Sequence, residues 1–146
     1  MVKDVEIKKI LVPIDGSKYG RIALDYAVTI AKGCGAYIEI LSVVDLSDYI
    51  SSFEQAGADM FMIKEMAHAA QDMVQEHKAL VPEGIHVNTR VAQGNVRDTI
   101  VRTAEQENVD LIIMGRRGLG TLEGMILGSV STYVVAHAPC AVLTVK

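Results

Sequence analysis

Short apolar runs alternate with longer amphipathic stretches along the chain. The apolar runs are rich in Val and Ile and are expected to form five strands, at residues 7–14, 36–44, 85–91, 109–114 and 140–145. The stretches between them carry apolar residues at helical spacing and are expected to form four helices, at residues 18–32, 58–80, 96–107 and 129–137. Strict alternation of strands with helices, joined by right-handed crossovers, predicts an α/β fold with a doubly wound parallel sheet.

The spacing of apolar residues also predicts which faces of the first two helices are buried. In the first helix it selects Ile22, Ala23, Tyr26, Ala27 and Ile30. In the second helix it selects Met62, Met66, Ala69, Met73 and Leu80. We expect both sets to pack in the core, and the alternative for the methionines is a soft surface that binds a partner.

Composition limits the class of protein. The chain has 146 residues, of which 50% are hydrophobic and 22% charged, so we expect one domain over residues 1–146 with a sizeable core. The net charge of -4 argues against nucleic acid as the main partner. Cys34 and Cys140 are too few and too far apart for a disulfide scaffold or a zinc site. Without a signal peptide or an apolar stretch near the ~18 residues of a membrane span, we expect a cytoplasmic protein that does not contact membranes.

The most informative local feature is a glycine-rich stretch between the fourth strand and the last helix. It contains Gly115, Gly118, Gly120, Gly124 and Gly128, five of the 12 glycines in the chain. Glycine permits positive φ angles and lets backbone amides approach a ligand closely. The helix that follows offers free amides and a partial positive charge at its first turn. A strand, a glycine-rich loop and a helix N-terminus in this order predict a phosphate-binding site.

Other interpretations of this stretch fit less well. A solvated linker would not carry as many apolar residues as it does: Leu119, Leu122, Met125, Ile126 and Leu127. It is not a P-loop, because Gly-x4-Gly-Lys-Ser/Thr does not occur in the chain. It is not a dinucleotide fingerprint, because the glycines follow the fourth strand and not the first.

The spacing Gly115-x2-Gly118-x9-Gly128-Ser129 resembles the nucleotide-binding signature of the universal stress protein family, in its ATP-binding branch. Residues 11–17 (LVPIDGS), 41–45 (LSVVD) and 138–145 (APCAVLTV) resemble other segments of that family, in the same order and at the same spacing. The resemblance implies a five-stranded sheet of order 3-2-1-4-5 that binds ATP. The nucleotide would lie where the order reverses, beyond the carboxyl ends of the first and fourth strands.

The resemblance further implies roles for individual residues. The backbone of Val43 would contact the adenine edge, and Pro13 and Asp15 would lie beside the nucleotide. Asp15 would be near the ribose or a bound cation, although it could also cap the turn before the first helix, where Ser17 is the expected N-cap. Met114 and Gly115 would flank the sugar. The phosphates would be held by amides and a hydroxyl from Gly118, Gly128, Ser129 and Val130.

The nucleotide would be ATP, with AMP or ADP as alternatives. Magnesium or manganese would accompany a triphosphate, whose roughly four negative charges need neutralising. Arg116 and Arg117 occupy variable positions of the motif, so a role in phosphate binding is a hypothesis of our own. No residue is singled out as catalytic.

The expected function is that of a nucleotide-dependent regulatory or stress-response protein with at most slow ATP hydrolysis, since no general base and no arginine pair that would stabilise the transition state is fixed by the sequence. The alternatives are a small nucleotide-dependent enzyme and a dimeric scaffold that does not bind nucleotide. The closing strand, residues 140–145, is apolar on both faces and would be an edge in this sheet order. Because this strand often pairs with its copy in the family, we expect a homodimer with a two-fold axis there.

Overall fold

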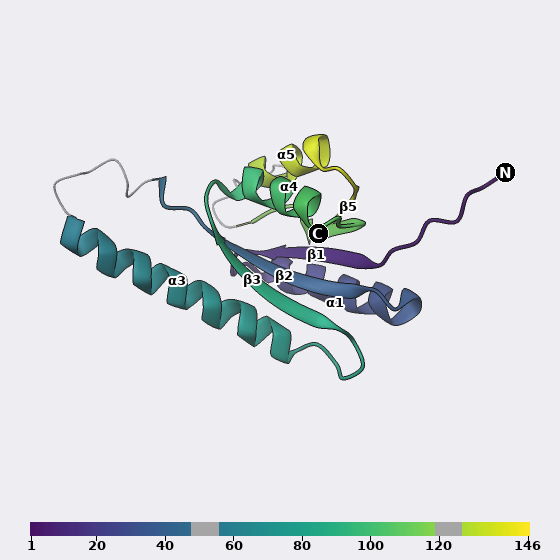
Figure 1. The fold of residues 1–146 in the computed structure, drawn as a ribbon, viewed down its shortest axis with the longest axis horizontal. Coiled ribbons are helices and arrows are strands. Elements are labelled where there is room, and N and C mark those ends of the chain that lie inside the picture. The colour runs from purple at the N-terminus through teal and green to yellow at the C-terminus, as the bar shows by residue number, and fades with distance from the viewer. Residues whose placement is uncertain (48–55, 119–126) are drawn as a thin grey trace.

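The computed structural model describes residues 1–47, 56–118 and 127–146 and contains one parallel sheet of five strands (Figure 1). The strands are β1 (Lys9–Ile14), β2 (Tyr37–Val44), β3 (Val87–Gln93), β4 (Leu111–Gly115) and β5 (Ala141–Val145). The helices are α1 (Lys18–Cys34), α3 (Ala56–Ala79), α4 (Val96–Gln106) and α5 (Ser129–His137). The strand order is β3-β2-β1-β4-β5, so the expected doubly wound fold and its order are confirmed.

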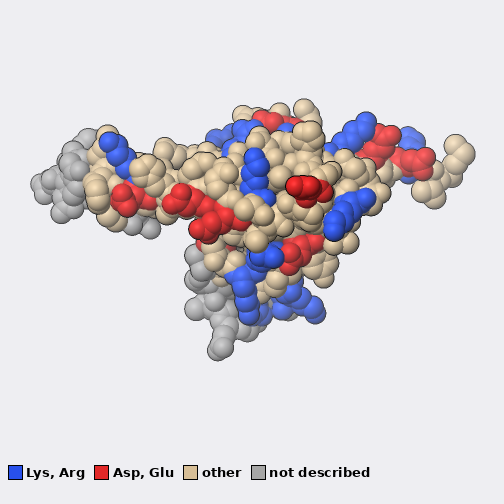
Figure 2. Space-filling model, turned by 90° about the horizontal axis from the view of Figure 1, so that it is seen from below, with Lys and Arg blue, Asp and Glu red and all other residues tan. Residues whose placement is uncertain are grey.

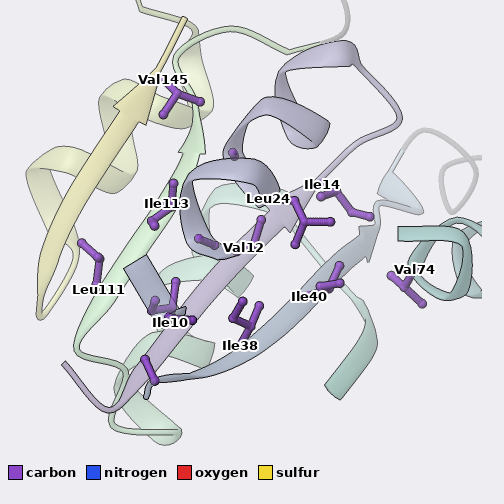
Figure 3. Packing of buried hydrophobic residues seen from close by; sticks show 14 residues of the cluster. Ile10, Val12, Ile14, Leu24, Ile38, Ile40, Val74, Leu111, Ile113 and Val145 are labelled. Atoms are coloured by element: carbon purple, nitrogen blue, oxygen red, sulfur yellow. The ribbon is translucent and has the colours of Figure 1, made fainter. Parts of the chain in front are cut away.

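The helices cover both faces of the sheet, and each face has its own apolar cluster. Side chains of Ile10, Val12 and Ile40 point toward α1 and α3 (Figure 3). Leu11, Leu41 and Ile112 lie in the other cluster, with residues of α4 and α5. Because successive strand residues point to opposite faces, a strand covered on both sides is apolar throughout. Of the helices described, none has both the length and the apolarity needed to cross a membrane.

The buried faces of α1 and α3 differ from those expected. In α1 the buried residues are Gly20, Ala23, Leu24, Ala27 and Ala31, while Tyr26 is 51% exposed. Among the described side chains of α3, Ala70 and Val74 are buried and Met62 is 43% exposed, and Leu80, just after the helix, is 48% exposed. Small residues face the sheet because the helices approach it closely: a Cβ on Gly20 would lie 3.1 Å from Ile14 Cγ2.

The N-terminal half of α3 extends beyond the end of the sheet (Figure 1). Figure 2 shows acidic side chains spaced along this protruding part of the molecule, and the exposed acidic residues of α3 include Glu65, Asp72 and Glu76. Met62 is therefore not a core residue, whereas Met73 is partly buried against the core. The core interpretation holds for only part of the methionine stripe.

Element boundaries shift by one to two residues from those expected. The third strand covers Val87–Gln93 and not residues 85–91, because its register pairs Ile38 with Val87 and Val44 with Gln93. Gly115 belongs to β4, where it pairs with Val145. The second helix begins at Ala56, two residues before its expected start at residue 58. Residues 48–55 lie outside the described residues, and so do the expectations for residues 119–126.

One charged residue is buried in the sheet. Glu39 in β2 is 1% exposed, and its carboxylate accepts a hydrogen bond of 2.7 Å from Arg90 Nε of β3. Lys9 Nζ lies 3.7 Å from the same carboxylate, and Glu107 bridges Lys9 and Arg90 at 3.0 Å each. The hydrogen bond from Lys9 and the charge of Arg90 hold the pKa of Glu107 below its usual range. This four-residue network joins β1, β2 and β3 to the end of α4.

We expect Glu39→Gln to lower the free energy of unfolding by about 1–3 kcal/mol, because it leaves two partly buried cations with one carboxylate. Urea unfolding measures the change. Glu6→Gln is the matched control, since it breaks an exposed ion pair between Glu6 and Lys8 and should leave the unfolding midpoint unchanged. Equal midpoints for the two variants would contradict the proposed importance of the buried network.

Candidate functional site

A pocket of about 140 Å³ lies beyond the carboxyl ends of β1 and β4, where the strand order reverses. At such a point the chain leaves neighbouring strands toward opposite faces of the sheet, and a crevice results. The nine residues selected from the sequence all line this pocket: Pro13, Asp15, Val43, Met114, Gly115, Gly118, Gly128, Ser129 and Val130. The structure therefore brings together the whole predicted set, from four separate segments of the chain.

The lining has an apolar part and a polar part. Leu41 and Val43 of β2 and Val96 and Ile100 of α4 supply apolar side chains. The turns after β1 and β4 and the start of α5 supply polar side chains and backbone amides. This combination suits a ligand that has an apolar ring system at one end and polar or anionic groups at the other.

The turn after β1 is held by Asp15. Its Oδ1 accepts a hydrogen bond of 2.9 Å from the backbone N of Ser17, so the capping role considered for Asp15 is confirmed. Ser17 occupies the N-cap position of α1, as expected, but its side chain makes no capping hydrogen bond. The amide that it would cap, Gly20 N, donates instead to Ser17 O at 3.3 Å. The Ser17 hydroxyl oxygen is buried at the pocket, with no hydrogen-bond partner among the described residues.

The two ends of the glycine-rich segment are joined through the backbone of Arg116. Its N donates to Val145 O at 2.7 Å, which ties the segment to β5. Its O accepts hydrogen bonds of 2.7 Å from Gly128 N and from the Ser131 hydroxyl. These bonds hold the start of α5 at the pocket, where the first-turn amides have no acceptor within the helix.

Among the described glycines of this segment, Gly115 and Gly118 are needed for space, not for a positive φ. Gly115, Gly118 and Gly128 all have φ angles outside the left-handed region, contrary to one reason for expecting glycine. A Cβ on Gly115 would overlap the Tyr19 side chain and lie 2.8 Å from Arg117 O. A Cβ on Gly118 would overlap Asp15 Oδ2. Close approach of the turns after β1 and β4 therefore requires glycine at both positions.

Eight further residues line the pocket: Ile14, Ser17, Gly20, Leu41, Val96, Ile100, Arg117 and Ser131. The sequence could have indicated Val96 and Ile100, because apolar residues four positions apart lie on one face of a helix. Ser17 had no signal that separates it from a helix cap, and Arg117, already considered for phosphate binding, had none that separates it from Arg116. In the part of the chain that the structure describes, no three His, Cys, Asp or Glu side chains are placed to hold a metal ion.

Comparison with known proteins gives consistent matches over nearly the whole chain. The family model described as the universal stress protein family matches residues 6–146. A universal stress protein of Methanocaldococcus jannaschii is 34% identical over 140 residues, which cover 95% of this chain and 82% of the relative. The solved structure of universal stress protein UspA from Lactobacillus plantarum superposes with a TM-score of 0.90 at 29% identity, and the match covers 98% of this chain and 100% of that one.

Two other solved universal stress proteins contain an adenine nucleotide. One is in complex with cAMP, with a TM-score of 0.66, 25% identity and coverage of 97% of this chain and 98% of that one. Another, from Arabidopsis thaliana, has AMP bound, with a TM-score of 0.63 and coverage of 95% and 91%; at 18% identity its likeness shows the fold alone. The family model, the relatives and the shared fold together show that this chain belongs to the universal stress protein family.

Proposed function

We propose that this chain is a single-domain, cytoplasmic universal stress protein that binds ATP and acts as a nucleotide-dependent regulatory protein in a stress response. The observation that carries the proposal is the pocket in which glycine-rich turns and a helix N-terminus adjoin an apolar wall. The AMP and cAMP bound to two structural neighbours support an adenine nucleotide as the ligand.

The roles of the residues follow from what each part of the pocket offers. The adenine ring lies against the apolar part, with its edge at the backbone of Val43. Met114 and Gly115 flank the sugar, and Pro13 and Asp15 lie beside it. The phosphates lie against Gly118, Gly128, Ser129 and Val130, because first-turn amides and the helix dipole favour anions there.

A triphosphate would bring magnesium or manganese with it. Asp15 is the one carboxylate that lines the described part of the pocket. Mg²⁺ commonly binds through one carboxylate together with phosphate oxygens and water, which fits this arrangement. ADP and AMP, which carry less charge, are the alternative ligands.

A regulatory role fits the pocket better than an enzymatic one. Rapid phosphoryl transfer needs a residue that positions the nucleophile, and the described lining contains no His or Lys. Asp15 Oδ1 is already bonded to the Ser17 amide. A small nucleotide-dependent enzyme and a scaffold without nucleotide remain the competing functions.

We also propose a homodimer through β5. This strand lies at the edge of the sheet, next to β4, and its first residue, Ala141, is exposed while Val142 and Leu143 are half-buried. A partly apolar edge strand with free backbone groups is suited to pairing with a copy of itself.

Titration calorimetry with Mg-ATP tests the nucleotide proposal. We expect ATP to bind with a Kd well below about 1 mM. Phosphate release should be far slower than roughly 1 s⁻¹, the lower end of typical enzyme turnover rates. Mass spectrometry of ligand released from freshly purified, denatured protein should recover ATP, ADP or AMP. No binding at millimolar ATP would favour the scaffold, and many turnovers per minute would favour the enzyme.

Gly118→Asp should weaken ATP binding by about tenfold or more, because it adds a carboxylate beside Asp15 where phosphate is expected. Gly33→Asp is the control, since a Cβ at Gly33 would have nothing within 4 Å. Circular dichroism checks that both variants fold, and Gly118→Ala separates the steric effect from the charge. Unaltered ATP affinity in folded Gly118→Asp would show that the phosphate assignment is wrong.

Light scattering after size exclusion should give a mass twice that of the chain. Ala141→Lys should shift the protein to monomers, because a charge on an edge strand opposes pairing. Tyr26→Lys places the same charge on exposed α1 and should leave the dimer intact. A monomeric wild type, or equal effects of the two variants, would count against the β5 interface.

A further inference from the structure

Two consecutive arginines follow β4, and the structure gives them different places. Arg116 anchors the chain through its backbone hydrogen bonds to Val145, Gly128 and Ser131, and it is not among the residues lining the pocket. Arg117 does line the pocket. The Nε atoms of both side chains are buried without a hydrogen-bond partner among the described residues. Both arginines occupy variable positions of the motif, but only Arg117 is among the described residues that line the pocket.

Arg117 is the one cationic residue in the described lining of the pocket, and Asp15 is the one anionic residue. The Asp15 carboxylate lies against Gly118, next to the expected place of the phosphates. A phosphate that enters the pocket therefore meets a like charge, and the repulsion must be offset by a cation. Arg117 is the described side chain that can supply this charge in the absence of a metal ion.

The unpaired Nε of Arg117 also favours an anionic ligand. A buried donor without an acceptor raises the free energy of the empty site, and binding that supplies an acceptor removes this penalty. The guanidinium group matches the geometry of phosphate oxygens and forms charge-assisted hydrogen bonds with them. Backbone amides carry only partial charges, so they discriminate less strongly between an anion and a neutral oxygen.

We propose that Arg117 is the residue that makes the pocket prefer a phosphorylated nucleotide to the nucleoside, by binding a phosphate group with its guanidinium. Arg116 instead positions the loop through its backbone. This inference rests on the proposed function, because it assigns the phosphate-reading residue of the same pocket.

The test compares AMP with adenosine by titration calorimetry, in EDTA so that no metal ion replaces the guanidinium. Arg117→Gln should weaken AMP binding by about 10- to 100-fold, the effect of losing charged hydrogen bonds, and leave adenosine binding nearly unchanged. Arg116→Gln, the matched control one position away, should change the ratio of the two affinities by at most a few-fold. Arg117→Lys keeps the charge and should retain part of the preference for AMP.

Salt gives a second readout that a purely structural role would not change. Added NaCl should weaken AMP binding to the wild type more than to Arg117→Gln, since screening acts on the charge that the variant lacks. An unchanged ratio of AMP to adenosine affinity in Arg117→Gln, or equal losses for Arg116→Gln and Arg117→Gln, would overturn the assignment. If the wild type bound adenosine and AMP equally, only this inference would fail. If it bound neither AMP, adenosine nor Mg-ATP, the proposed function would fail with it.

Discussion

The close approach of the turn after β1 to the turn after β4 sets the geometry of the polar part of the pocket. Asp15 Oδ2 occupies the space that a Cβ of Gly118 would fill, and Tyr19 does the same at Gly115. The backbone of Arg116 then joins the glycine-rich segment to β5 and to the start of α5. Two turns, one strand and one helix N-terminus are thereby held together at the point where the strand order reverses.

The contact between these two turns depends on the strands that lead into them being held firmly in the sheet. The strands near the pocket are buried on both faces, and small residues of α1 allow that helix to lie close to β1. The polar network around Glu39 joins β1, β2 and β3 to the end of α4. Buried ionic groups need several partners to offset their desolvation. Here Lys9 and Arg90 both lie near the carboxylate of Glu39, and Glu107 contacts the same two cations.

Charge within the pocket is nearly balanced. The described lining holds one carboxylate and one guanidinium, along with serine hydroxyls and helix amides. The Asp15 carboxylate is hydrogen-bonded to a backbone amide, and the helix amides belong to the backbone itself. Arg117 instead contributes a full positive charge on a side chain. A pocket of this kind can bind a ring system by apolar contact and recognise an anion separately, so the two parts of a nucleotide can be tested independently.

The sequence by itself determined the five strands and the parallel sheet, because alternation is a local pattern. The set of nine residues that line one pocket followed from the resemblance of its motifs to those of the universal stress protein family. The apolar spacing selected only part of the buried face of α1: Leu24 and Ala31 are buried and Tyr26 is exposed, because the helix packs the side opposite its exposed charged residues against the sheet. Only the tertiary structure showed that Gly115 and Gly118 make room for Tyr19 and Asp15, and that Arg117 lines the pocket while Arg116 does not. These features depend on contacts between segments far apart in the chain, and such contacts leave no periodic pattern in the sequence.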